Sequence, residues 1–356
     1  MHGIHAEELI DVNTTKIDTL RQKHERSTAL RSTIKQVYIY VVLLLIVLLF
    51  SVVKLDQVKF FERGHFLSPD SVINLMRTAV PILTLSGAFT LLMISGYIDL
   101  SVGSAMSLSS VVFAWMVLNG FNFFIAIVVT LILGIGMGFL NGTLVMKLRI
   151  TPVIATLVTL SLFKGIALLI VPDGLSAIKS SPGVAMAGWI NDYARKPLFL
   201  GLPWAFWVAI FMIALLIVLQ RKTLLGKYAA AIGGNRLAAE LSGINAVRVV
   251  WLIYIIVGFF AGLAGVARAS YMSLGDPLSG DGMETACIIA VLLGGTAFSG
   301  GEGSVAKTMV GAIIIMCVTT GLMTVIPAYW QTLAMGTVLI SAVVINHLLS
   351  QEKVKA

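Results

Sequence analysis

Ten stretches of mostly apolar residues follow one another along the chain, and short polar gaps separate them. They lie at residues 36–53, 71–94, 101–118, 123–145, 152–171, 203–220, 249–272, 282–298, 307–326 and 330–349. Each is close to the roughly 20 residues that a helix needs to cross a bilayer. Only 12% of the residues are charged, whereas a soluble domain has about 25%. The pattern predicts an all-α membrane protein that crosses the bilayer about ten times.

The distribution of Lys and Arg predicts that both ends of the chain lie in the cytoplasm. With a cytoplasmic N-terminus, 16 of the 25 Lys and Arg residues fall on the cytoplasmic side, as the positive-inside rule requires. Lys164 falls near an outer helix end. The chain then divides into a polar cytoplasmic tail (1–35), a transmembrane domain (36–350) and a cytoplasmic tail (351–356). This topology explains the net charge of +8, so nucleic-acid binding is not expected.

Ten spans divide into five plus five, and a unit of five spans repeated in tandem is inverted in the membrane. Two stretches carry a trace of such a repeat: "GYIDLSVGSAMSLSSVV" from Gly96 and "GDPLSGDGMETACIIAV" from Gly275. Each is a glycine-rich turn with a carboxylate that opens into a helix of small residues, and the two fall on opposite sides. We expect a five-plus-five inverted repeat, and chance similarity between short turns stays open as the alternative.

Glycines spaced by four residues recur in two of the apolar segments. Gly134, Gly138 and Gly142 lie in one segment, and Gly258 and Gly262 lie in another. In a membrane such stripes allow two helices to approach closely. The spacing favours tight packing within the bundle over contact with a ligand.

The long gap at 221–248 predicts a short helix on the cytoplasmic face. Gly233, Gly234 and Asn235 interrupt regular structure, and Asn235 suits the cap of a helix over 236–242. Gly243 suits the position just after its end. A helix of about two turns is not stable alone, so it needs a surface to lie on. Both the protein's own bundle and a separate partner satisfy that need.

Asp99 stands between two apolar segments, where a carboxylate in hydrocarbon would cost several kcal/mol. Asp99 or Ser101 is expected to cap the third helix, and Gly96 and Gly103 allow a tight turn. Two interpretations remain open: a helix cap alone, or a hinge or gate at the inner mouth of a pathway. The same pair of interpretations applies to Glu284 on the outer side.

No residues in the sequence predict an enzyme. The glycine-rich stretch at 294–307 does not match a P-loop, and no metal-binding or catalytic set can be assembled. Cys287 and Cys317 lie within apolar segments and are expected to be buried as small apolar side chains. An ion-coupled secondary transporter is the alternative to a transporter powered by a partner. It usually places a charged site near the membrane midplane, whereas ionisable residues are expected here at helix ends.

Four stretches, in this order, resemble one family. They are "GYIDLSVGS", "LRITPVIATLVTLSLFKGIA", "GKYAAAIGGNRLAAELSGINAVRV" and "IIAVLLGGTAFSGGEGSVAKTMVGAIII". Together they are similar to the membrane permease subunits of bacterial ABC importers for ribose, galactose, xylose and related simple sugars, and to autoinducer-2 permeases. The resemblance covers roughly residues 70–350. Tyr97 stands where the family usually has a second glycine, which restricts the backbone at that turn.

The resemblance implies that residues 232–247 contain the coupling helix, which docks into a groove of a cytoplasmic ATPase. The residues that it assigns to this contact are Gly233, Gly234, Asn235, Arg236, Ala238, Ala239, Glu240, Ser242 and Gly243. The candidates for a gate in the translocation pathway are Asp99, Ser101, Gly103 and Glu284.

The resemblance also implies a location and partners. The chain is expected in the bacterial cytoplasmic (inner) membrane, without a cofactor. The expected partners are the ABC ATPase, a second permease subunit that is identical or homologous, and a periplasmic or lipid-anchored substrate-binding protein. That binding protein is expected on the outer loops, chiefly 172–202 and 273–282.

Overall fold

The computed structural model describes residues 40–41, 43–48, 68–171, 176–177, 192–323, 333, 336–337 and 340. The chain divides into two units at Leu45, and all packing discussed below lies within the second unit. The predicted segments at 36–53 and 330–349 lie mostly outside the described residues. The tails at 1–35 and 351–356 lie entirely outside them.

The eight predicted segments between residues 71 and 326 are all helical. They are α2 (Pro69–Ile94), α3 (Val102–Leu118), α4 (Phe123–Gly142), α5 (Pro152–Ile170), α7 (Trp204–Lys222), α10 (Ala246–Met272), α11 (Met283–Leu293) and α12 (Val305–Met323). A π-helical turn, η1 (Thr143–Lys147), extends α4. Within the described residues, five helices are long and apolar enough to cross a membrane, and three shorter apolar helices accompany them. A polytopic membrane fold is therefore confirmed.

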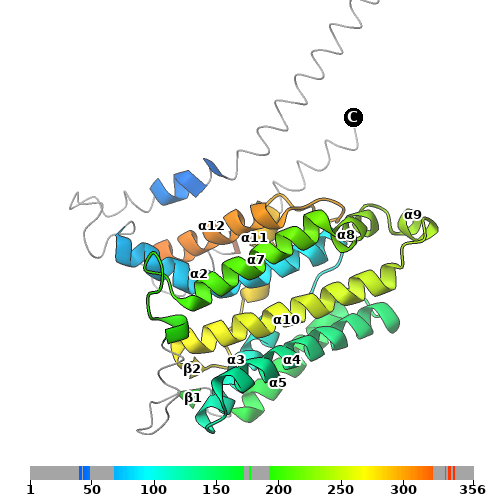
Figure 1. Cartoon of the computed structure of the whole chain (residues 1–356). Coiled ribbons are helices and arrows are strands. Elements are labelled where there is room, and N and C mark those ends of the chain that lie inside the picture. The colour runs from blue at the N-terminus through cyan, green and yellow to red at the C-terminus, as the bar shows by residue number, and fades with distance from the viewer. Residues whose placement is uncertain are drawn as a thin grey trace, which may run out of the picture. The chain divides into compact units, whose positions relative to one another are not determined.

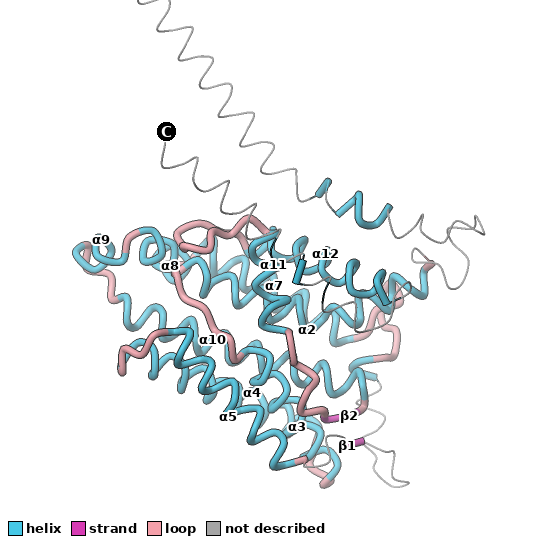
Figure 2. The backbone as a smooth tube through the Cα atoms, turned by 180° about the vertical axis from the view of Figure 1, so that it is seen from behind, coloured by secondary structure: helices cyan, strands magenta, loops and turns pink. Residues whose placement is uncertain are grey.

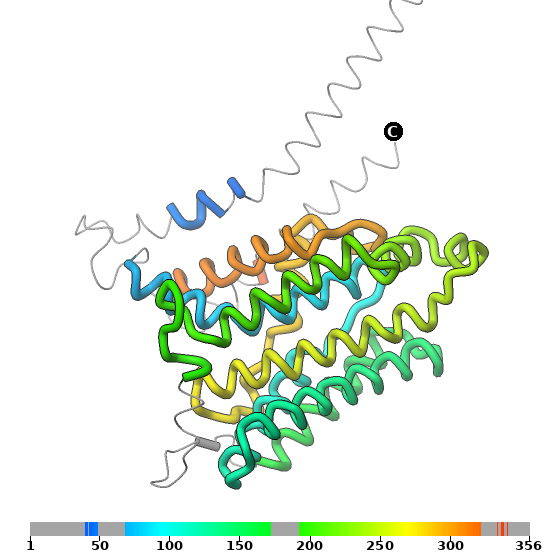
Figure 3. The backbone as a smooth tube through the Cα atoms, in the orientation of Figure 1, coloured from blue at the N-terminus to red at the C-terminus, as the bar shows by residue number. Residues whose placement is uncertain are grey.

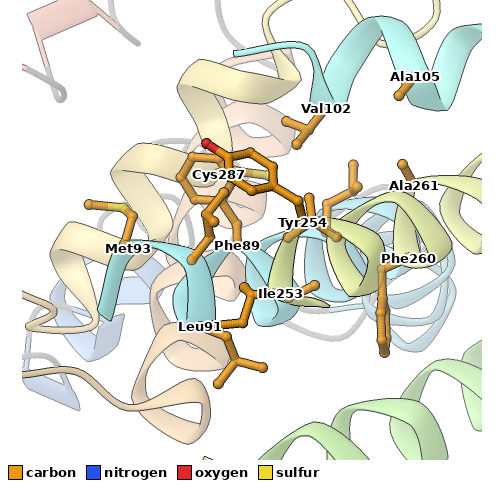
Figure 4. Packing of buried hydrophobic residues seen from close by; sticks show 14 of the residues in the cluster. Phe89, Leu91, Met93, Val102, Ala105, Ile253, Tyr254, Phe260, Ala261 and Cys287 are labelled. Atoms are coloured by element: carbon orange, nitrogen blue, oxygen red, sulfur yellow. The ribbon is translucent and has the colours of Figure 1, made fainter. Parts of the chain in front are cut away.

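Helices α2 and α10 form the centre of the bundle, and α4, α5 and α7 lie around them. In the most apolar 18 residues of each helix, 89% of the stretch is buried in α2 and 72% in α10. The buried share is a third or less in α4, α5 and α7. Figure 4 shows Phe89 of α2, Val102 of α3 and Tyr254 of α10 in one buried cluster. Figure 3 shows α12 beside α2, although the two are far apart in sequence.

The glycine stripes pack α4 against α10, as the spacing predicts. A Cβ atom on Gly134 would overlap the carbonyl oxygen of Gly258, and one on Gly138 would overlap the carbonyl oxygen of Tyr254. Gly262 faces the backbone of Thr130 and Leu131. The two backbones therefore touch, which larger side chains would prevent. Cys287 and Cys317 are free and buried, as expected.

The two ends of the bundle carry different structures (Figures 1 and 2). At one end, the short helices α8 (Leu224–Gly234) and α9 (Arg236–Leu241) precede the start of α10. At the other end, α10 leads into β2 (Leu274–Gly275), which pairs antiparallel with β1 (Ser176–Ala177). We call these the α9 end and the β end. With 27 residues, α10 spans about 40 Å between them.

Helices α3 and α11 begin inside the bundle and run toward opposite ends. The first turn of α3 meets the residues just before α11, because a Cβ atom on Gly103 would overlap the carbonyl oxygen of Gly280. Ser109 contacts Gly265, seven residues before the last residue of α10. Gly103 precedes Ser109 by six residues in α3, so it lies about six residues further from the β end than Gly265 does. This places Gly103 about 20 Å from the β end, near the middle of α10. The connections at 95–101 and 276–282 thus enter the membrane depth from opposite ends.

Candidate functional site

The predicted short helix is present as α9, which begins at the expected residue and ends one residue earlier than expected, at Leu241. The Asn235 side chain accepts a hydrogen bond from the Ala238 N–H at 3.0 Å, which satisfies one of the unpaired donors of the first turn. Ser242 is the C-cap residue. Gly243 follows it with a φ of 83°, which glycine adopts without strain.

Helix α9 packs on the bundle through one small residue and leaves its leucines exposed. Ala239 is only 5% exposed, whereas Leu237 is 68% exposed and Leu241 is 81% exposed. A lid over the bundle would bury these leucines, because burial of a leucine contributes about 1.5–3 kcal/mol. The arrangement is typical of a surface that a partner covers.

Three segments meet backbone to backbone beside α9. A Cβ atom on Gly233, in α8, would overlap the carbonyl oxygen of Ile94 at the end of α2. The Gly301 N–H, in the α11–α12 connection, donates to that same Ile94 oxygen at 2.8 Å. Gly300 lies against both Gly96 and Gly233. We call this contact the glycine junction; it joins α8 directly to the segment that carries Asp99.

A second contact joins α9 to the same connection. The Arg236 guanidinium donates to the Tyr97 hydroxyl at 2.8 Å and to the Glu240 carboxylate at 2.9 Å. Burial raises the pKa of the Tyr97 phenol despite the neighbouring cation. The hydrogen bond to Glu240 raises the pKa of the Arg236 guanidinium. The contact therefore joins a cation to a neutral hydroxyl.

Asp99 is buried in a polar network inside the bundle. Its carboxylate accepts hydrogen bonds from the Ser101 N–H (2.8 Å), the Ser101 hydroxyl (2.7 Å) and the Asn141 amide (3.0 Å). Ser101 holds the N-cap position of α3, but no side chain caps this helix. The Ser101 hydroxyl donates to Asp99, and Asp99 accepts from the Ser101 N–H, so the expected cap by Asp99 or Ser101 is wrong. Tyr254 of α10 donates to the carbonyl oxygen of Ile98 at 2.9 Å. Asp99 therefore ties its connection to α4, and the neighbouring Ile98 carbonyl ties the same connection to α10.

Sequence reasoning missed Asn141 and Tyr254. Asn141 interrupts the small-residue stripe of α4 between Gly138 and Gly142. A polar residue within a membrane span is costly unless it has a partner, so this was the signal that could have found it. Tyr254 carried no such signal, because a tyrosine near the end of a span is also typical of the membrane interface.

Gly103 and Glu284 come together where α3 meets α11. A Cβ atom on Gly103 would lie 2.5 Å from a Glu284 carboxylate oxygen. The Gly280 N–H donates to the Ser107 hydroxyl at 2.8 Å. Glu284 lies in the first turn of α11, but that turn is near mid-depth. Glu284 lies at a helix end, as expected, but the expectation that this end lies on the outer side is wrong.

Comparison with known proteins defines the class of the chain. Residues 71–344 match the family described as the permease component of the branched-chain amino acid transport system. The chain belongs to this family. No solved structure shows a significant match.

Several curated relatives are sugar permeases. The ribose import permease RbsC of Bacillus subtilis is 33% identical over 79% of this chain and 86% of its own length. The D-allose permease AlsC of Escherichia coli is 32% identical over 81% of this chain and 86% of its own length. The fructose import permease FruF of Bifidobacterium longum is 30% identical over 80% of this chain and 81% of its own length.

Proposed function

We propose that the chain is the translocation subunit of an ABC importer for a simple sugar in the bacterial inner membrane. The observation that carries the proposal is the similarity to ribose, allose and fructose permeases over about four fifths of the chain. The multi-helix membrane architecture agrees with it. The chain itself is not an enzyme, and ATP hydrolysis belongs to a partner.

The proposed docking site for the ATPase is α9 and the residues around it. The set comprises Gly233, Gly234, Asn235, Arg236, Ala238, Ala239, Glu240, Ser242 and Gly243. The exposed Leu237 and Leu241 support this role, because they offer apolar area at the end of the bundle. The α9 end is then cytoplasmic, and a substrate-binding protein docks at the β end.

In the proposed mechanism, ATP binding moves the ATPase pair and α9 with it. The glycine junction and the Arg236–Tyr97 contact pass the movement to the connection at 95–101. Asp99 and Ser101 hold that connection to α4, and it continues into α3, whose first turn meets α11 at Gly103 and Gly280. Two such subunits, identical or homologous, alternate between outward and inward openings. The opposite directions of α3 and α11 support a five-plus-five inverted repeat.

The test is sugar uptake by the assembled transporter in vesicles. Ribose, allose and fructose are supplied with the co-purified ATPase and binding protein, and uptake is measured with and without ATP. We expect uptake of one of them to require ATP. Uptake driven by an ion gradient without ATP would instead establish a secondary transporter, with Asp99 as the first candidate for its ion site.

A charge on α9 tests the docking site. Leu241→Arg is expected to release the ATPase, whereas Leu148→Arg, in the α4–α5 connection, is expected to retain it. Both leucines are exposed, so neither substitution creates a clash. Ala239 is unsuitable for this test, because it packs against the bundle and a tryptophan there would disturb the chain's own fold. Co-purification of the ATPase with Leu241→Arg at the wild-type ratio would contradict the assignment.

A further inference from the structure

An ion pair lies close to the middle of the bundle, beside the meeting point of α3 and α11. Lys164 of α5 donates to both oxygens of Asp281, at 2.7 Å and 3.0 Å. Lys164 is twelve residues after the first residue of α5, so it lies about 18 Å along that helix. Asp281 follows Gly280, which contacts Gly103 at mid-depth. The sequence had placed Lys164 near an outer helix end.

The pair is open to its surroundings. The Lys164 side chain is 33% exposed and that of Asp281 is 52% exposed. Glu284 lies close enough to both to interact with them electrostatically. Charged groups at this depth are costly in hydrocarbon and almost always face a bundle interior or a water-filled cavity.

Helix α5 carries exposed apolar and exposed polar side chains next to one another. Leu162 and Leu169 are exposed and apolar, as lipid requires. Ser161 is exposed one turn before Lys164, and the apolar Leu157 and Val158 are exposed one turn before Ser161. The polar part of the helix surface is therefore confined to Ser161 and Lys164, where Lys164 reaches Asp281 just before α11.

We propose that Lys164, Asp281 and Glu284 line the translocation pathway and form a transit site for an uncharged, polyhydroxylated solute. This inference rests on the proposed function. It assigns the residues that line the pathway and the hydrogen bonds that they make with the solute. An ammonium group donates hydrogen bonds and carboxylates accept them, whereas a sugar hydroxyl does both. Two carboxylates against one ammonium leave a net negative charge, which disfavours anionic solutes.

The cluster of Lys164, Asp281 and Glu284 adjoins the backbone contact between Gly103 and Gly280. These two glycines bring the backbone of α3 against the residues just before α11, with the Glu284 carboxylate beside Gly103. Separation of the two helices would open space directly beside Glu284 and Asp281. A solute in this space would form hydrogen bonds with Lys164, Asp281 and Glu284 at a depth where the hydrocarbon core of the membrane offers no hydrogen-bond partner.

Thiol labelling tests whether the cluster faces water. In a background with Cys287→Ala and Cys317→Ala, Ser161→Cys and Leu162→Cys are compared in native membrane vesicles of the full chain. A membrane-impermeant methanethiosulfonate reagent is expected to label Ser161→Cys at least tenfold faster. Equal and slow labelling of the two positions would mean that this face is covered by lipid or protein, and would overturn the proposal.

Transport by charge variants tests the contact with solute. Lys164→Gln and Asp281→Asn are each expected to lower ATP-dependent uptake of the sugar that the wild type transports at least tenfold, with ATP hydrolysis and assembly retained. The exchange Lys164→Asp with Asp281→Lys restores an ion pair but reverses the positions of donor and acceptor. We expect uptake to stay low in this variant. Full recovery of uptake would reveal a purely structural pair and overturn the proposal.

The two proposals fail in different ways. If wild-type vesicles take up none of the sugars with ATP, the importer function is wrong, whatever the labelling result. If wild-type uptake is ATP-dependent but Ser161→Cys reacts no faster than Leu162→Cys, only the pathway wall is wrong.

Discussion

Arg236 donates a hydrogen bond of 2.8 Å to the hydroxyl of Tyr97, across 139 positions of sequence. The contact joins the exposed helix α9 to the connection that carries Asp99. Tyr97 occupies the position where related permeases are expected to have glycine, so this link depends on a side chain that glycine lacks.

Tyr97→Phe removes the hydroxyl and keeps the ring. A hydrogen bond of this kind contributes about 1 kcal/mol, which corresponds to about a fivefold change in an equilibrium. We expect the number of ATP molecules hydrolysed per sugar transported to rise about that much, because α9 moves without its connection. ATPase activity and sugar uptake are measured together in vesicles. An unchanged ratio would show that the glycine junction alone transmits the movement.

The Tyr97–Arg236 contact is expected to be insensitive to pH between about 6 and 9. Burial raises the pKa of the Tyr97 phenol and the bond to Glu240 raises that of Arg236. Both groups therefore keep the same proton through this range. Sugar uptake per ATP hydrolysed is measured in wild type and in Tyr97→Phe at each pH. The wild-type value divided by the Tyr97→Phe value should stay constant over this pH range. A change near neutral pH would mean that another titrating group acts on the contact.

Gly233→Ala and Gly234→Ala form a matched pair of adjacent substitutions. A Cβ atom at Gly233 would overlap the Ile94 carbonyl oxygen, whereas one at Gly234 would meet nothing within 4 Å. We expect Gly233→Ala to lower the free energy of unfolding by about 1–3 kcal/mol. Gly234→Ala should change it by less than about 0.5 kcal/mol. Thermal unfolding in detergent measures both, and equal melting temperatures would argue against a tight junction.

Asp99→Ala distinguishes a gate from a purely structural anchor of the connection. The substitution leaves the Ser101 N–H and the Ser101 hydroxyl without their acceptor, which costs about 1–3 kcal/mol each if they stay buried. The Asn141 amide loses its bond to Asp99 but keeps its bond to the Ser101 hydroxyl. If the connection is a gate, uptake falls at least tenfold, more than the loss of stability explains. If only the melting temperature falls, the carboxylate serves the fold alone.

Asn141→Ala provides the control for Asp99→Ala. The effects of substitutions within one hydrogen-bond network do not add up. The double variant should therefore take up sugar only slightly more slowly than either single variant. Uptake rates of the wild type, the two single variants and the double variant give the interaction energy directly. Independent, additive losses would show that Asn141 does not act through Asp99.

Much of the helical framework could be predicted from the sequence, because hydropathy records which residues a membrane accepts. The ends of α4, α5 and α10 fall within three residues of their predicted positions. The end of α11 does not: it was expected near 298, but the helix stops at Leu293. Gly294 and Gly295 follow, and the positive φ of Gly295 turns the chain away.

Hydropathy could not predict how deep in the membrane a helix begins. A run of small and apolar residues predicts a membrane span whether the helix starts at the surface or inside the bundle. Helices α3 and α11 start inside the bundle. Lys164 lies six residues before the last residue of α5, so it is closer to the outer end of that helix, as predicted. Its pairing with Asp281, 117 positions away, was not predicted. Pairing of this kind is a property of tertiary structure, and a single sequence does not record it.

The glycine junction is made of main-chain atoms from α2, α8 and the α11–α12 connection. The junction requires glycine at position 233, but it contains no atom of α9. The exposed leucines of α9 can therefore change to fit a different ATPase while the junction stays intact. Arg236 is the exception, because it also holds Tyr97.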